Sequence, residues 1–164
     1  MRMKNFLLLI TYFWIASATA QTFHFHKDGS ADFIVHNVAR KKANSLYSAA
    51  EKWINMNLDG QDDVYRSRMP GRNLSFAGTL HHAFQKQNSS YDAAYIIELH
   101  FKDGKYRVRY LHQALLSGTK RATITIGEAL AEKPSKDNHW TSPKMQYEAA
   151  VNKLLTSLHR TIAH

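Results

Sequence analysis

The sequence contains no cysteine among its 164 residues. Disulfide bonds, a cysteine nucleophile and a lipid anchor on an N-terminal cysteine are therefore excluded, and the hydrophobic core must stabilise the fold. The sequence also lacks the G-x-S-x-G, Walker A and G-x-G-x-x-G motifs, which mark serine nucleophiles and nucleotide sites. We assign no catalytic residue and expect no cofactor.

The first twenty residues have the composition of a secretory signal peptide. A basic stretch (MRMKN) precedes an apolar run (FLLLITYFWIA), and the small residues SATA follow it. This order predicts cleavage after Ala20 and export of the remaining chain. The apolar run is short for a transmembrane helix, which needs about 20 residues. We therefore expect a periplasmic or secreted protein that is not a lipoprotein and has no transmembrane segment after cleavage.

The expected mature chain, residues 21–164, is long enough for one domain and hardly long enough for two. The whole chain has a formal charge of +9, and the loss of Arg2 and Lys4 with the signal peptide leaves 20 basic and 13 acidic side chains, a charge of +7. Such a charge favours anionic partners, such as nucleic acid, lipid headgroups or acidic glycans. Because exported proteins rarely meet nucleic acid, we do not expect it as the partner.

Two segments have the periodicity of amphipathic helices. The first follows a cap at Asn44 or shortly before it and ends before Gly60. The second begins at Pro143, with Ser142 as its cap. The apolar stripes consist of Leu46, Tyr47, Ala50, Trp53 and Ile54 in the first segment, and of Tyr147, Val151, Leu154, Leu155, Leu158 and Ile162 in the second.

Other segments follow the two-residue period of strands. Asp32–Val38 is the first candidate, and the stretch from Asp62 that contains DVYRSR is the second. A turn at Pro70 and Gly71 separates it from a third candidate, NLSFAGTLHHAF. His82 lies in the apolar phase of this third strand, which favours a histidine buried in the core.

The fourth and fifth strands form a hairpin around Asp103 and Gly104, because Asp-Gly is a preferred two-residue turn. One face of the hairpin is apolar and the other is largely basic, so we expect the core to cover only one side of the sheet. The turn predicts these cross-strand pairs: Lys102 with Lys105, Phe101 with Tyr106, His100 with Arg107, Leu99 with Val108, Glu98 with Arg109 and Ile97 with Tyr110.

The order of these segments is strand, helix, four strands, helix. It predicts an α+β domain with a single antiparallel sheet of about five strands and two helices on one face, the other face being open. Residues 117–141 are the least regular part. Within them ATITI is compatible with a short edge strand and GEALA with a helical turn.

Two stretches of sequence carry a resemblance to a known family. The run LYSAAEKWINMN, followed about forty residues later by ELHFKDGKYRVRY and then by a late amphipathic helix, resembles an exported bacterial family of unknown function with a TATA-binding-protein-like (TBP-like) fold. The resemblance covers Asp32 to Ile162. It implies the same order of strands and helices, but no catalytic or binding residues, and a fold name does not imply DNA binding.

Ten histidines raise the question of a metal site. The best candidates, His24 and His26, share one face of an extended segment, but no further ligand stands at a typical spacing. We therefore assign no metal site and keep these two residues as weak candidates.

The basic face of the hairpin is the strongest functional feature, and it comprises Glu98, His100, Arg107 and Arg109. The two arginines lie about 7 Å apart along one strand and can clamp a phosphate or carboxylate. In the alternative interpretation, Glu98 simply pairs with Arg109 in a solvated surface. Our leading hypothesis is a non-catalytic domain that binds an envelope protein or an anionic envelope component. The alternative is a small envelope hydrolase acting on glycan or ester substrates through residues that converge only in the fold.

Overall fold

The computed structural model describes residues 22–26, 31–58, 62–86, 89–117, 120–121, 125–131 and 142–164. The predicted signal peptide, residues 1–20, lies outside these ranges. No helix in the described part of the chain combines the length and apolar composition that a membrane span requires. The elements are β1 (Ile34–Asn37), α1 (Ala43–Asn57), the 3-10 helix η1 (Asp62–Val64), β2 (Tyr65–Met69), β3 (Asn73–Lys86), β4 (Ser89–Lys102), β5 (Lys105–Ser117), β6 (Lys120–Arg121), α2 (Ile126–Leu130) and α3 (Pro143–Ala163).

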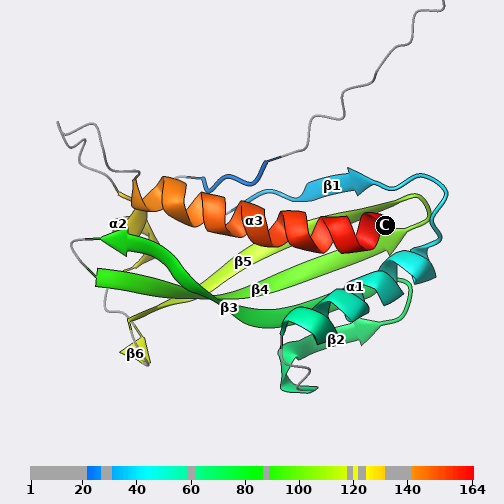
Figure 1. The fold of residues 1–164 in the computed structure, drawn as a ribbon, viewed down its shortest axis with the longest axis horizontal. Coiled ribbons are helices and arrows are strands. Elements are labelled where there is room, and N and C mark those ends of the chain that lie inside the picture. Colours follow the sequence, from blue (N-terminus) through cyan, green and yellow to red (C-terminus); the bar gives the residue numbers. More distant parts are fainter. Residues whose placement is uncertain are drawn as a thin grey trace, which may run out of the picture.

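The strands form one antiparallel sheet in the order β1-β5-β4-β3-β2, and the two-residue β6 pairs with the end of β5. Helices α1 and α3 lie on the same face of this sheet (Figure 1). The predicted α+β fold, with five main strands and two long helices on one face, is therefore confirmed.

The predicted register of the hairpin is also confirmed, from Lys102 opposite Lys105 to Ile97 opposite Tyr110. Along β4 the buried and the more exposed residues alternate from Ala93 to Phe101. The odd-numbered side chains of this stretch pack in the core beneath the helices, and the even-numbered ones face the open side of the sheet. The alternation of the sequence therefore decides which face is covered.

Each helix buries the stripe that the sequence predicts. All five predicted residues of α1 are buried, and those of α3 are buried except Leu154, which is only partly covered. The indole Nε1 of Trp53 donates a 3.0 Å hydrogen bond to Ser157 Oγ, which ties the two helices together. The stripes thus form the second layer of the core.

The beginning of α1 is held by the hairpin turn. The cap residue is Lys42, just before Asn44, and its own side chain makes no capping bond. The carboxylate of Asp103 instead accepts the N–H of Ala43 at 2.9 Å and pairs with the Lys42 ammonium, also at 2.9 Å. These two contacts lower the pKa of Asp103. The turn residue that forms the hairpin therefore also caps a helix 60 residues earlier in the chain.

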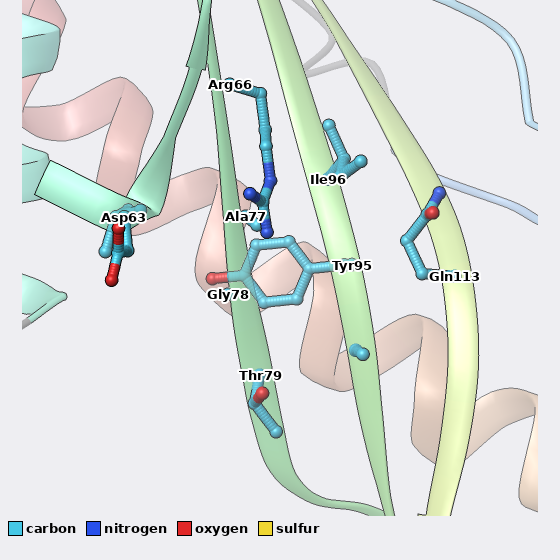
Figure 2. A pocket seen from close by; sticks show the side chains of 10 residues that line it. Asp63, Arg66, Ala77, Gly78, Thr79, Tyr95, Ile96 and Gln113 are labelled. Carbon is cyan, nitrogen blue, oxygen red and sulfur yellow. The ribbon is translucent and has the colours of Figure 1, made fainter. Parts of the chain in front are cut away.

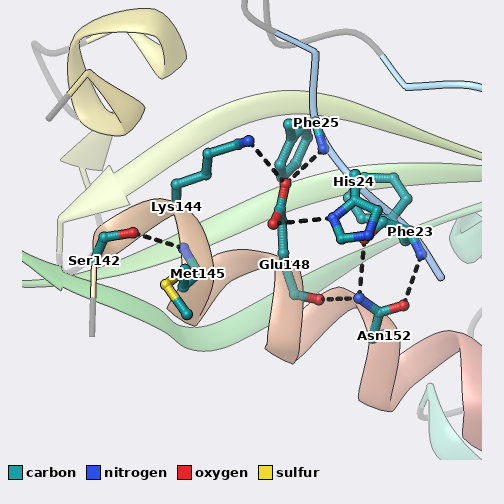
Figure 3. A network of polar contacts seen from close by, with 8 residues as sticks. All are labelled: Phe23, His24, Phe25, Ser142, Lys144, Met145, Glu148 and Asn152. Atoms are coloured by element: carbon teal, nitrogen blue, oxygen red, sulfur yellow. Dashed lines mark hydrogen bonds and ion pairs between the residues drawn. The ribbon is translucent and has the colours of Figure 1, made fainter.

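The short segment Thr22–His26, here called the strap, lies across α3 (Figure 3). The backbone N–H of Phe23 donates to Asn152 Oδ1 and that of Phe25 donates to Glu148 Oε1, both at 2.8 Å. The two phenyl rings are buried and pack edge-on against each other and against Tyr110. Phe23 and Phe25 are therefore part of the core, and the sequence analysis did not predict their burial.

Glu148 is the one charged residue buried among those that the structure describes. Burial raises the pKa of this carboxyl group, but the N–H of Phe25, the imidazole of His24 and the nearby Lys144 outweigh burial and lower the pKa below its usual value. The carboxylate thus satisfies a backbone donor that would otherwise be buried without a partner.

The expectation that His82 lies in the core is wrong. The β3–β4 register shifts between Leu80 and Phe84, and His82 adopts a positive φ of 52° in this bulge. The extra residue turns the His82 side chain to solvent, where its Nδ1 lies 2.9 Å from Ser90 Oγ, and brings Ala83 and Phe84 into the core. A bulge breaks the two-residue period, so a phase counted from Leu74 fails beyond it.

In the irregular region 117–141, GEAL belongs to α2. Thr125 caps this helix by accepting the N–H of Glu128, and the Glu128 carboxylate accepts the N–H of Thr125 in return. The reciprocal bonds form a capping box, which explains why so short a helix is well defined at its start. The stretch ATITI and residues 132–141 lie largely outside the described residues.

Candidate functional site on the open sheet face

One row of side chains crosses the open face near the hairpin turn. Each main strand contributes one residue, and each is the register partner of the next. In strand order the row is Val35, Arg107, His100, Asn73 and Met69. It brings together His100 and Arg107 of the hairpin, Asn73 at the start of β3, and one residue from each end of the strand order, so only the folded sheet assembles it.

A hollow of about 640 Å³, here called the basic hollow, lies over this row. Four cationic side chains line it, and none of its lining residues is acidic. Arg72 is positioned there because its carbonyl oxygen accepts the N–H of Phe101 at 2.8 Å, which fixes the β2–β3 turn beside β4. The lining residues are Val35, Met69, Arg72, Asn73, His100, Phe101, Lys102, Lys105, Tyr106 and Arg107.

The predicted arginine pair is held by an aromatic ring. The guanidinium groups of Arg107 and Arg109 lie 4.6 and 5.2 Å from the centre of the Phe33 ring. Glu98 is the register partner of Arg109, but among the described residues the two side chains form no ion pair. Stacking on a ring orients a guanidinium group without using its hydrogen-bond donors. The arginines therefore keep donors for a ligand.

His100 lies between the arginines and the opposite edge. Its Nδ1 donates a 2.7 Å hydrogen bond to Asn73 Oδ1, while the Asn73 amide nitrogen donates to Met69 Sδ at 3.6 Å. Burial lowers the pKa of His100, the Arg107 charge lowers it further, and Glu98 raises it in part. The imidazole is thus neutral at pH 7 and gains its charge only in acid.

A second depression, here called the central hollow, lies further along the same face and has a volume of about 400 Å³ (Figure 2). Its floor is formed by Ala77, Ala94 and Ile96. These residues face the open side because they alternate with core residues on β3 and β4. Exposed polar side chains surround this floor, namely Asp63, Arg66, Thr79 and Gln113.

The two weak metal candidates do not converge. His24 and His26 are both exposed on the strap, as expected for alternate residues, but they contact different carboxylates. His24 Nδ1 lies 3.4 Å from Glu148 Oε2, and His26 Nε2 lies 3.0 Å from Asp32 Oδ2. Within the described ranges, no three histidine or acidic side chains are grouped so that they could hold a metal ion.

Two histidines, a serine and an aspartate lie close together at the β3 bulge, but they do not form a catalytic triad. Asp92 accepts from the ring of His81 and from the backbone N–H of His82, both at 2.8 Å. Ser90 Oγ contacts the ring of the other histidine, His82, at 2.9 Å. The carboxylate therefore orients one imidazole and the serine contacts the other, so no Ser-His-Asp arrangement forms.

Sequence reasoning identified His100 and Arg107 but did not assign Arg72, Lys102 or Lys105 to the site. The two lysines were predictable, because the register already placed them opposite each other at the end of the basic face. Arg72 had no such signal, since its position depends on a long-range backbone bond to β4.

Neither a family model nor a curated protein sequence matches the chain. Two solved structures do. One is a DUF4468 family protein from Bacteroides ovatus, with a TM-score of 0.57 and 12% identity over 84% of this chain and 88% of that chain. The other is a TBP-like protein from Parabacteroides distasonis, with a TM-score of 0.58 and 10% identity over 80% of this chain and 90% of that one. The chain has a TBP-like fold. At these identities the TBP-like neighbours establish the fold alone.

Proposed function

We propose that the chain is a non-catalytic, exported binding domain whose open sheet face holds an anionic component of the cell envelope. The basic hollow carries this proposal. Four cationic side chains from one turn and two strands line it, and no carboxylate does. One of them, Arg107, is stacked with the neighbouring Arg109 on Phe33 rather than paired with an acid. A cluster of unpaired cations in a concave surface attracts and holds a phosphate or carboxylate group.

The acid that could neutralise the hollow is engaged elsewhere. Asp103 belongs to the same hairpin as Lys102 and Lys105, but its carboxylate points to the beginning of α1 and pairs there with Lys42. The fold thus separates the acid of the KDGK sequence from its outer lysines. This separation supports a ligand-binding role for the positive charge.

The test is a comparison of two double charge reversals with the same net charge. Lys105→Glu with Arg107→Glu alters the hollow, whereas Lys52→Glu with Lys153→Glu alters exposed positions of the helices. Binding of galacturonate oligomers and of inorganic pyrophosphate is measured by calorimetry at several salt concentrations. We expect the hollow variant to lose more than tenfold in affinity, which corresponds to about 1.4 kcal/mol, and the helix variant to stay within about twofold of wild type.

Equal losses in both variants would show that only net charge matters, because any strongly basic protein binds polyanions in a salt-dependent way. No binding of either probe to the wild type, together with capture of a protein partner through the same face, would replace the anion by a protein ligand.

The pH dependence provides a second check through His100. A ligand anion favours the charged imidazole, so affinity for an anion that stays ionised should increase as the pH falls from 7.5 to 5.5. The variant His100→Gln should lose this increase. An unchanged pH profile in His100→Gln would remove His100 from the site.

Export remains a proposal based on residues 1–20. N-terminal sequencing of the protein from its native host should give Gln21 as the first residue, in the periplasmic or extracellular fraction. A cell-associated product that begins at Met1 would contradict it.

A further inference from the structure

The central hollow differs from the basic hollow in its chemistry. Its floor of Ala77, Ala94 and Ile96 is apolar and has no large side chain other than Ile96. The rim offers hydrogen-bond donors and acceptors, and its one acid and one base, Asp63 and Arg66, balance in charge. The volume of about 400 Å³ is within the range of small-molecule sites. The site thus suits an uncharged polar group.

Tyr95 supports the floor from the core side of the sheet. Its side chain is almost entirely buried, at 1% exposure, and its ring packs against Tyr110 and over Gly78, where the missing side chain leaves room for it (Figure 2). The polar groups that can meet a ligand in the central hollow are therefore those of its exposed rim.

A sugar ring has the matching chemistry. One face of the ring is a nearly flat array of C–H groups, which packs on small apolar side chains, and its hydroxyl groups extend sideways to donors and acceptors. Arg66, Thr79 and Gln113 stand around the floor in positions to meet such groups (Figure 2). An apolar floor with few polar groups on the rim is the general form of a ligand site.

The two hollows lie on one face within the length of one short oligosaccharide. Ile96 precedes His100 by four residues on β4, which is about 13 Å at strand rise. The row between them contains Ser75, Glu98 and Arg109 and has no net charge. A second anionic group on the ligand would meet one acid and one base at each place, Glu98 with Arg109 and then Asp63 with Arg66, and would find no surplus of positive charge there, unlike in the basic hollow.

We propose that the ligand of the open face is a short oligosaccharide that is acidic at one end, with its acidic group in the basic hollow and a neutral sugar unit in the central hollow. This inference rests on the proposed function, because it takes anion binding in the basic hollow as given. It adds the class of the ligand, its polarity along the sheet and the role of the second site.

The test uses sialyllactose, a neutral disaccharide with one acidic sugar at its end, beside free sialic acid, lactose, galacturonate and trigalacturonate. Binding is measured by calorimetry, and backbone amide shifts locate each probe. We expect sialyllactose to bind at least tenfold more tightly than sialic acid or lactose, and to shift the amides of both hollows. Trigalacturonate should gain less than threefold over galacturonate.

Two variants separate the sites. Ala77→Leu fills the floor, and Thr79→Ala with Gln113→Ala removes exposed rim groups, so the second remains usable if the first does not fold. Both should bring sialyllactose down to the affinity of sialic acid and leave sialic acid unaffected. Ala39→Leu, at an exposed position outside the two hollows, is the matched control and should behave as wild type.

The outcomes distinguish the two proposals. If sialic acid binds in the basic hollow but the lactose unit adds less than twofold, or if the variants keep the full gain, the inference about the central hollow is wrong and the proposed function stands. If none of the anions binds, or if they bind equally well to the charge-reversed hollow, the proposed function has failed as well.

Discussion

Acid should loosen the attachment of β1 to the rest of the fold through two stacked histidines. His36 on β1 lies against His159 of α3, with ring centres 4.2 Å apart, and against Tyr106 of β5, at 5.0 Å. The hydroxyl of Tyr106 is 2.8 Å from Nδ1 of His159. Burial, followed by the charge of His159, lowers the pKa of His36 from 6.5 to about 4. Burial, and then His164, lower the pKa of His159 as well.

Proton linkage gives the sign and the size of this loss of stability. The unfolded chain binds a proton at position 36 below pH 6.5, whereas the folded chain does so only near pH 4. The full stabilisation by the neutral imidazole is therefore present above pH 6.5 and is lost as the pH falls towards 4. The difference between these pKa values corresponds to at most about 3 kcal/mol, and because His36 is only partly buried we reduce the expected loss to about 1 to 2 kcal/mol.

The assay is urea unfolding at pH 7.5, 6.0 and 4.5 for the wild type and for His36→Phe, which keeps an aromatic ring in the stack. The free energy of unfolding of the wild type should fall by about 1 to 2 kcal/mol more than that of the variant over this range. His26→Gln, at an exposed position, is the control and should follow the wild type. Equal losses in the wild type and His36→Phe would refute the reasoning, because another group would then bind the proton.

Three further changes test the packing. Glu148→Ala leaves the buried N–H of Phe25 without an acceptor, so urea unfolding should show a loss of about 1 to 3 kcal/mol; an unchanged midpoint would mean that water replaces the carboxylate. Gly78→Ala places a methyl group against the Tyr95 hydroxyl, and the same measurement should show a loss of about 1 to 3 kcal/mol unless the ring moves freely. Asp103→Ala removes the cap of α1, so its thermal midpoint should be lower than that of Asp103→Asn, and equal midpoints would contradict the capping role.

The candidate site shows where prediction from the sequence ends. The alternation around the Asp-Gly turn placed His100 and Arg107 on one face and paired them correctly, because a hairpin is a local structure. The register pair of Glu98 with Arg109 is present, but the ion pair of the alternative interpretation is not formed, because the guanidinium groups of both arginines stack on Phe33, just before β1. The partner of a surface side chain can come from a part of the chain that only tertiary structure brings close, so the strand register alone does not predict it.

Local periodicity by itself determined the order of the strands and helices, the register of the late hairpin, the residues that each long helix buries and the side of the sheet that remains open. These follow from steric periods of 2 and 3.6 residues and from turn chemistry, which act over a few neighbouring residues. Tertiary structure alone decided the strap on Glu148, the bulge that turns His82 to solvent, the helix cap from Asp103 and the position of Arg72 in the basic hollow. Each of these depends on a backbone group that must find a hydrogen-bond partner in a buried or crowded place, and that partner comes from wherever the folded chain brings it.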